Sequence, residues 1–276
     1  MTTQQRKAEN FRTLHQRPGA FIMPNPWDAG TAKLLARLGF EALATTSAGL
    51  AFALGRPDGE GAITRAETLA NARDIVAATE LPVSADLENG FGDRPEDCAA
   101  TIRLAAEAGL VGGSIEDTTG DRNDPIYPFD LSVERVKASV AAARALPFPF
   151  MLAARAENLI SGRPDLPDTI RRLQAFAAAG ADVLYAPGLK TSAEVTAVVQ
   201  AVAPKPVNVI MGLSGGSLSL RELSALGVKR VSVGSALARA ALGALLRGAE
   251  EMRQQGSFGF ADAAAPYAEI NRQLRE

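Results

Sequence analysis

Short apolar runs alternate with longer amphipathic stretches along the whole chain. The two kinds of segment repeat at a spacing of roughly 20 to 35 residues, which is typical of βα units in a parallel sheet. The apolar runs predict eight strands, near residues 20–25, 41–46, 82–86, 111–116, 149–155, 181–186, 206–211 and 229–233. The amphipathic stretches predict helices near 28–38, 64–79, 95–108, 132–146, 166–179, 191–203, 219–226 and 235–254, several of which open at a capping residue: Asp28, Thr64, Ser132 and Ser235.

Eight strands, each followed by a helix, favour an α/β fold of the (β/α)8 TIM-barrel type over an open, doubly wound sheet. A leader helix near 5–16 precedes the repeat, and a helical extension over 235–276 follows it, with a polar tail near 260–276. No Pro-, Gly- or Ser-rich linker divides the chain. We therefore expect residues 1–276 to form a single domain.

Composition narrows the possible classes of function. The 276 residues carry 29 basic and 31 acidic side chains, a net charge of −2, and the 47% of hydrophobic residues is enough to bury a full core. No basic stripe is present, so neither nucleic acid nor a membrane is an expected partner. No membrane-length apolar run or signal-peptide core occurs, and the one cysteine, Cys98, cannot form an internal disulfide. We expect a soluble, cytoplasmic protein.

In a barrel of this type the chemistry lies at the carboxyl ends of the strands, so the residues there are the candidates for a site. These positions combine several acids with a lone arginine and a few neutral polar side chains. They are Asn25, Trp27, Thr45, Thr46, Ser47, Asp86, Glu88, Glu116, Asp117, Arg155, Glu157, Tyr185, Asn208 and Ser232 to Ser235.

Asp86 and Glu88 are the most informative pair among these residues. The two-residue period of a strand points both side chains to one side, where two like charges repel unless a cation or a proton lies between them. Mg²⁺, which takes oxygen ligands and keeps several waters, suits such a pair, although two solvated acids at a strand end would look the same. Arg155 has two compatible interpretations: a bidentate clamp for a substrate carboxylate, or an internal partner of Glu88, Glu116 or Glu157.

The chain resembles the isocitrate lyase/phosphoenolpyruvate mutase superfamily at six segments that occur in the expected order and span nearly the whole barrel. They are Pro24-Asn25-Pro26-Trp27-Asp28-Ala29, Thr45-Thr46-Ser47-Ala48-Gly49, Pro57-Asp58-Gly59, the run from Ser84 to Gly92, Gly113-Ser114-Ile115-Glu116-Asp117 and Ala153-Ala154-Arg155-Ala156-Glu157. Each segment alone is a weak signal, but six in order are specific.

The resemblance implies a (β/α)8 barrel and a site for Mg²⁺, with Mn²⁺ as a substitute, at the carboxylates Asp58, Asp86, Glu88 and Glu116. It also implies a small 2-oxo or 2-hydroxy carboxylate bound by the backbone of Ser47, Ala48 and Gly49 and by Arg155. Around this anchor we expect Trp27, Asp86 and Asn208 to contact substrate, and Arg155, Glu116, Asp58 and Tyr185 to act in catalysis. The family further implies that the last helices are exchanged between subunits of a homotetramer, a dimer of dimers.

One segment departs from the isocitrate and methylisocitrate lyases of this superfamily, which carry a Lys-Lys/Arg-Cys-Gly-His loop after the fourth strand, and in this the chain resembles the branch that lacks the catalytic-cysteine loop. The corresponding residues here, 118–130, contain neither cysteine nor histidine, and we expect them to form a lid. Cys98 falls inside a predicted helix, and His15, the one histidine, lies in the leader. Proton transfer is then left to a water on the metal, to a tyrosine (Tyr127 or Tyr185) or to a carboxylate (Asp117 or Glu157).

The sequence therefore predicts a Mg²⁺-dependent lyase that cleaves a carbon–carbon bond of a small 2-oxo or 2-hydroxy di- or tricarboxylate through a pyruvate-type enolate. Two alternatives remain open: a hydrolase or mutase acting on a carbon–phosphorus bond, and a catalytically weak protein that binds a 2-oxo acid. A glycine-rich loop at 212–217, together with Gly234 and Ser235, is a weaker candidate for a phosphate site.

Overall fold

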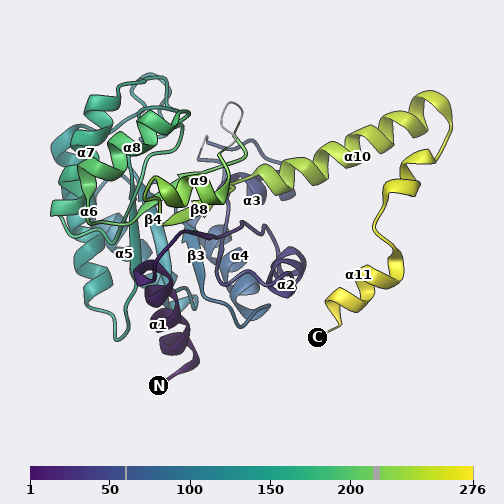
Figure 1. Ribbon diagram of the computed structural model, residues 1–276, viewed down its shortest axis with the longest axis horizontal. Coiled ribbons are helices and arrows are strands. Elements are labelled where there is room, and N and C mark those ends of the chain that lie inside the picture. Colours follow the sequence, from purple (N-terminus) through teal and green to yellow (C-terminus); the bar gives the residue numbers. More distant parts are fainter. Residues whose placement is uncertain (60, 214–217, 276) are drawn as a thin grey trace.

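The computed structural model describes residues 1–59, 61–213 and 218–275, and within them eight parallel strands curl into a (β/α)8 barrel of TIM type (Figure 1). The strands are β1 (Phe21–Ile22), β2 (Leu43–Ala44), β3 (Val83–Asp86), β4 (Gly112–Glu116), β5 (Met151–Arg155), β6 (Val183–Tyr185), β7 (Val207–Ile210) and β8 (Arg230–Ser232). The predicted fold class is confirmed, and each strand falls within its predicted range but is shorter.

The sheet order β1-β8-β7-β6-β5-β4-β3-β2 places β1 and β2 at its two ends. The amide of Ala44 donates to the carbonyl oxygen of Pro24 over 3.0 Å and so joins these ends. Above that bond the buried side chain of Asn25 donates to the carbonyl oxygen of Thr45 and accepts from the amides of Val233 and Gly234, each over 2.9 Å. Asn25 therefore ties three strand ends together at the face where function is expected.

The helices form the outer layer of the barrel and its two extensions. They are α1 (Thr3–Gln16), α2 (Ala29–Arg37), α3 (Ser47–Ala53), α4 (Arg65–Ala77), α5 (Pro95–Glu107), α6 (Phe129–Arg144), α7 (Leu166–Ala178), α8 (Ser192–Val202), α9 (Leu220–Ala225), α10 (Ala236–Gln255), the 3₁₀ turn η1 (Gly259–Ala263) and α11 (Tyr267–Leu274). Helix α3 was not predicted from the pattern.

The predicted capping residues have different outcomes. Asp28 and Thr64 cap α2 and α4, each in a reciprocal capping box, as predicted. The prediction for Ser132 is wrong, because α6 begins at Phe129, directly after Pro128, and Ser132 lies buried inside the helix. Ser235 occupies the N-cap position of α10, but its side chain makes no capping hydrogen bond.

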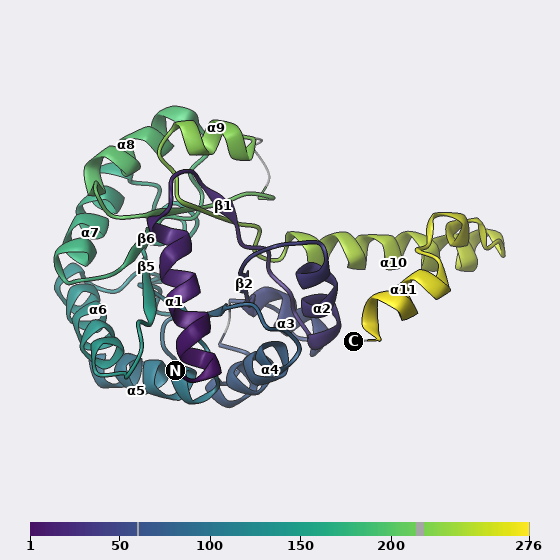
Figure 2. The same ribbon diagram turned by 60° about the horizontal axis from the view of Figure 1, so that its bottom comes forward.

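Helix α1 lies across the amino-terminal end of the barrel, in the middle of the helical ring in Figure 2. Its apolar residues Phe11 and Leu14 are buried in one cluster with Met151 and other barrel residues. A Cβ atom at Gly112 would come within 2.9 Å of the Phe11 ring, so the glycine allows this close packing. The predicted leader helix, α1, therefore closes the amino-terminal end of the barrel, and we call it the plug.

The C-terminal extension leaves the barrel as an arm (Figure 1). Helix α10 projects away from the body with Leu245 and Leu246 exposed by 66% and 62%, and the chain returns through η1 to α11, which packs on α2. Exchange of these helices between subunits stays a prediction. No helix in the described part of the chain is long and apolar enough to cross a membrane.

His15 provides a test of the plug. Its ring packs edge-on against Phe11 and Phe21, Nδ1 donates to the carbonyl oxygen of Phe11 over 2.8 Å, and the residue is 4% exposed. Burial, and to a lesser extent the nearby charge of Arg230, lowers the pKa of His15 from 6.5 to about 3. We expect the imidazole of the folded protein to remain neutral at pH 5, which NMR can follow through the one histidine of the chain.

The unfolded chain takes up this proton and the folded protein does not, so the free energy of unfolding should fall as the pH drops from 6.5 towards 3. His15→Gln, which cannot be protonated, should lose this part of the pH dependence. A folded-state pKa near the ordinary value would contradict the buried, neutral plug.

Candidate active site

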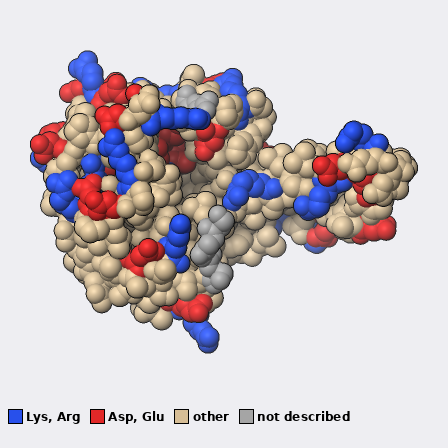
Figure 3. Space-filling model, turned by 90° about the horizontal axis from the view of Figure 1, so that it is seen from above, with Lys and Arg blue, Asp and Glu red and all other residues tan. Residues whose placement is uncertain are grey.

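Two cavities open at the carboxyl ends of the strands and share Ser47, Asp58 and Arg155 in their linings. The larger, the acidic cavity, has a volume of about 850 Å³ and is lined by Asp58, Glu88, Glu116 and Glu157 among others. The smaller, the inner cavity, has about 170 Å³ and is lined by Tyr185, Asn208, Arg230 and Ser232, among others. Seen from above, acidic side chains are visible inside a hollow of this face (Figure 3).

Arg155, at the end of β5, is the centre of the acidic cavity. Its guanidinium pairs with Asp86 over 2.9 Å, Glu116 over 3.0 Å and Glu157 over 2.8 Å, with only 12% of the side chain exposed. Burial opposes the charged form, but these carboxylates hold the pKa of Arg155 well above its usual value. Of the two interpretations of Arg155 from sequence, the internal partner is the one seen here, with Glu116 and Glu157 but without Glu88.

Asp86, at the end of β3, is held by residues that follow β2 and by Arg155 on β5. Its Oδ2 accepts from the hydroxyl of Ser47 over 2.8 Å and from the Ser47 amide over 3.3 Å, while its Oδ1 faces Arg155. The hydroxyl of Thr45 accepts from the Asp86 amide over 3.0 Å. Because each carboxylate oxygen already has a donor, the orientation of Asp86 is fixed.

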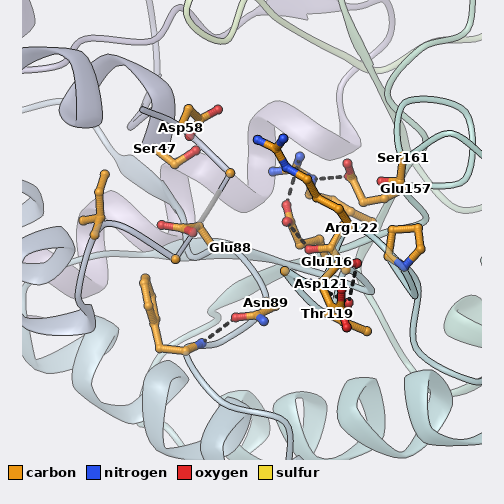
Figure 4. Close-up of a pocket in the computed structure, with 18 of the residues that line it drawn as sticks. Ser47, Asp58, Glu88, Asn89, Glu116, Thr119, Asp121, Arg122, Glu157 and Ser161 are labelled. Carbon is orange, nitrogen blue, oxygen red and sulfur yellow. Dashed lines mark hydrogen bonds and ion pairs between the residues drawn. The ribbon is translucent and has the colours of Figure 1, made fainter. Parts of the chain in front are cut away.

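Glu88 and Asp58 complete the acidic group (Figure 4). Burial raises the pKa of Glu88 to about 8, with the charges of Asp86 and Glu116 adding to the rise. Asp58 stands at the exposed rim, yet partial burial and the same two charges raise its pKa as well. Oε1 of Glu88 is buried without a hydrogen-bond partner, and the residue has a φ of 47°, in the left-handed region. An orphaned oxygen beside like charges is a position that a cation would satisfy.

The donor set fits Mg²⁺ better than a metal that needs a complete protein cage. All four candidate ligands, Asp58, Asp86, Glu88 and Glu116, supply carboxylate oxygens. Within residues 1–59, 61–213 and 218–275, however, no three acidic, histidine or cysteine side chains converge closely enough to ligate one ion directly. Mg²⁺ retains several waters and commonly takes only one or two protein carboxylates, so an open arrangement of acids is compatible with it.

Glu157 and Asp117 lie behind Arg155. Burial raises the pKa of Glu157 to about 8 against the opposing charge of Arg155. Burial also raises the pKa of Asp117 to about 6, although Asp117 accepts from the Glu157 amide over 2.9 Å and pairs with Arg172 over 3.1 Å. Asp117 lines neither cavity, so its contacts support the site from behind.

The turn into α3 brings Ser47, Ala48 and Gly49 to the site, as expected, but two of the three amides are already engaged. The Ser47 amide donates to Asp86, and that of Gly49 donates to the hydroxyl of Thr46 over 3.2 Å. Ala48 lines the inner cavity. Trp27 lines neither cavity and packs beside Gly49, where an added Cβ would come within 2.9 Å of it. The proposed substrate contacts of these residues stay predictions.

The inner cavity holds a chain of hydrogen bonds, of which the sequence predicted some members and missed one. Tyr185 and Asn208 were expected at strand ends, and both are buried here. Arg230 was missed because it lies within the apolar segment of β8 and not at its carboxyl end. A charged residue in a buried strand was the signal that could have identified it. Its Nε donates to Asn208 over 2.8 Å, and Asn208 donates to Ser232 over 3.0 Å. Burial raises the pKa of Tyr185, whose ring lies 5.0 Å from the Arg155 guanidinium.

The segment after β4 covers the acidic cavity. A bridge between Thr118 and Ile126 folds it back on itself, and Asp124 pairs with Arg163 over 2.9 Å. Arg122 points into the cavity (Figure 4). Tyr127 lines neither cavity, because its hydroxyl donates to Asp93 over 2.6 Å. Of the weaker phosphate-loop candidate, residues 214–217 lie outside the described residues.

Cys98 is fully buried in α5, beneath the turn that carries Glu88. Its Sγ donates to the carbonyl oxygen of Asn89 over 3.6 Å, and burial raises the pKa of the thiol. It lines neither cavity. The prediction of a small core residue inside a helix is confirmed.

We expect Mg²⁺ binding to depend on Asp86. Asp86→Ala removes the carboxylate that Ser47 and Arg155 orient, so calorimetry should show Mg²⁺ affinity lowered by at least about tenfold, the equivalent of one charged hydrogen bond. Glu88→Gln should have a smaller effect if Glu88 acts through water. Glu134→Gln, an exposed acid on α6 that pairs with Lys137, is the matched control. Unchanged Mg²⁺ affinity in a folded Asp86→Ala protein would refute the metal site.

Comparison with known proteins agrees with this geometry. The family profile of phosphoenolpyruvate phosphomutase matches residues 11–253. The 2,3-dimethylmalate lyase of Eubacterium barkeri is 30% identical over 228 residues, covering 80% of this chain and 77% of the lyase. A crystal structure from Burkholderia cenocepacia J2315, provisionally described as a lyase/mutase, is 65% identical with a TM-score of 0.96 over 99% of this chain and 97% of its own.

A structure of oxaloacetate acetylhydrolase with the product oxalate is 26% identical, with a TM-score of 0.87, and covers 97% of this chain and 93% of its own. The family match extends over most of the barrel, including every strand that carries a candidate residue. The chain belongs to the phosphoenolpyruvate phosphomutase family, within the isocitrate lyase/phosphoenolpyruvate mutase superfamily of lyases and mutases.

Proposed function

We propose that the protein is a Mg²⁺-dependent lyase that cleaves a carbon–carbon bond of a small 2-oxo or 2-hydroxy di- or tricarboxylate through a pyruvate-type enolate. The observation that carries the proposal is the group of carboxylates around Arg155, with Glu88 left partly unpaired. Mg²⁺, or Mn²⁺ in its place, would supply positive charge that stabilises the enolate oxygen as negative charge develops there.

The chain's own residues would prepare the site in three ways. Arg155 holds Asp86 and Glu116 in fixed positions, and Ser47 fixes the second oxygen of Asp86. Tyr185, whose raised pKa keeps the proton on Oη, is a candidate proton donor in the inner cavity. Glu157 offers a second candidate on the acidic side. The lid from Thr118 to Ile126 would exclude water during the reaction.

Two relatives support carbon–carbon chemistry. One is named for 2,3-dimethylmalate, a substituted 2-hydroxy dicarboxylate, and the other for oxaloacetate, a 2-oxo dicarboxylate. The name of the family profile supports the alternative, chemistry at a carbon–phosphorus bond. The absence of a cysteine and a histidine from residues 118–130 keeps a third possibility open, a protein that binds a 2-oxo acid with little turnover.

Turnover of a substrate panel separates these three functions. Oxaloacetate, 2,3-dimethylmalate, methylisocitrate and phosphonopyruvate are incubated with the protein, with and without Mg²⁺, and the products are identified by mass spectrometry. We expect carbon–carbon cleavage of one di- or tricarboxylate, at least about a hundredfold slower in Asp86→Ala, because loss of one group that places positive charge at a developing oxyanion costs about 10² to 10³ in rate. Phosphate release from phosphonopyruvate, or its rearrangement to the isomer phosphoenolpyruvate followed by phosphorus NMR, would favour the alternative, and binding without any turnover would leave a binding protein.

We also propose that α10 and α11 mediate a homotetramer. An isolated helix with Leu245 and Leu246 exposed by 66% and 62% has an apolar face that needs a partner. Light scattering at micromolar protein should give the tetramer mass, and Leu245→Glu with Leu246→Glu should lower it. Ala145→Glu, on the exposed end of α6 across the barrel from the arm, is the control. A stable parent monomer would refute the proposal.

A further inference from the structure

Arg230 is a buried cation without an acidic partner. The residue is 3% exposed, and in the described part of the chain its guanidinium makes no ion pair. Nε donates to Asn208 over 2.8 Å, while Nη1 is buried with no hydrogen-bond partner. A buried charge without a partner costs free energy. Burial lowers the pKa of Arg230 to about 10, and the nearby positive charge of Arg155 acts in the same direction.

The other buried arginines of the barrel donate to acids or to carbonyl oxygens of the protein. Arg155 pairs with three carboxylates, and Arg172 pairs with Asp117 and Asp168 over 3.1 and 2.8 Å. Arg135 donates to the carbonyl oxygens of Gly92 and Asn89, although its Nε is buried without a partner among the described residues. Within that same part of the chain, Arg230 differs from Arg155 and Arg172 because it makes no ion pair, and from Arg135 because it lines the inner cavity.

The surroundings of Arg230 suit a small anion. The inner cavity of about 170 Å³ is lined by Arg230 together with the neutral Tyr185, Asn208 and Ser232, and also by Asp58 and Asp86, of which Asp86 is already paired with Arg155. An engineered protein cavity of about 150 Å³ holds one benzene molecule, so this space has room for roughly six non-hydrogen atoms. That is enough for a short branch that ends in a carboxylate.

We propose that Arg230 binds a second carboxylate of the substrate in the inner cavity, so that the enzyme selects dicarboxylates over monocarboxylates of the same length. The inference rests on the proposed function, because it concerns the same site. A planar guanidinium can pair with both oxygens of a carboxylate, and Nη1 of Arg230 has no partner in the described part of the protein. Arg155, whose donors face Asp86, Glu116 and Glu157, is less free to do so.

A matched pair of acids tests this selectivity. Malate and 2-hydroxybutyrate share the 2-hydroxy acid end and differ only in having a carboxylate or a methyl group at the other. Calorimetry with Mg²⁺ present should show that the parent protein binds malate at least about tenfold more tightly, the equivalent of one charged hydrogen bond. In Arg230→Met the affinity for malate should fall to that for 2-hydroxybutyrate, which should itself be unchanged.

Arg230→Lys keeps the charge and guards against a Met variant that does not fold, which circular dichroism would reveal. The Lys variant should weaken malate binding and leave 2-hydroxybutyrate binding unchanged, because it lacks the planar fork. A parent protein without preference for malate, or a folded variant that loses affinity for both acids equally, would overturn the inference. This test measures binding and not turnover. If the protein cleaves a substrate of the panel but shows no preference for malate, the role of Arg230 is rejected and the proposed function stands.

Discussion

The charge of Arg155 is the interaction on which the rest of the site depends. Asp86, Glu116 and Glu157 come from the ends of β3 and β4 and from the residues after β5, and each approaches the same guanidinium within 3.0 Å. Without that cation the acids would repel one another in a partly buried space. Removing one partner of a buried ion pair commonly costs roughly 3 to 5 kcal/mol. The positive charge of Arg155 therefore keeps these acids close together beside the acidic cavity.

A second layer of contacts fixes the backbone that carries these acids. Glu88 has a left-handed backbone conformation, which costs free energy in a residue with a side chain. The turn after it is clamped because Arg135, 1% exposed, donates to the carbonyl oxygens of Gly92 and Asn89. Cys98 packs against the same turn, where a Cβ on Gly90 would come within 2.8 Å of its sulfur. The packing of α5 and α6 therefore determines where Glu88 points.

The sequence pattern predicted the barrel well because a parallel strand buried on both faces is an apolar run, and its covering helix is amphipathic. It also predicted which residues stand at strand ends, since the strand positions fix them. It could not decide the partners of Arg155, because a clamp and an ion pair use the same residues. Helix α3 was missed, since its seven residues are too few to show a period. Arg230 was missed because the search was limited to strand ends, and this side chain starts two residues earlier.

The two cavities divide the charge of the site unequally, and this division limits what can bind. The acidic cavity repels an anionic substrate until a cation or a proton offsets Asp58 and Glu88, whose pKa values are raised by burial and then by the charges of Asp86 and Glu116. The inner cavity is lined by Asp58, Asp86, Arg155 and Arg230, and of the two arginines only Arg230 makes no ion pair with the residues that the structure describes. A substrate with negative charge at both ends is stabilised only if each end meets positive charge, one beside the acids and one at Arg230. The position of Arg230 therefore favours a substrate whose two negative charges lie at opposite ends, whichever bond is broken.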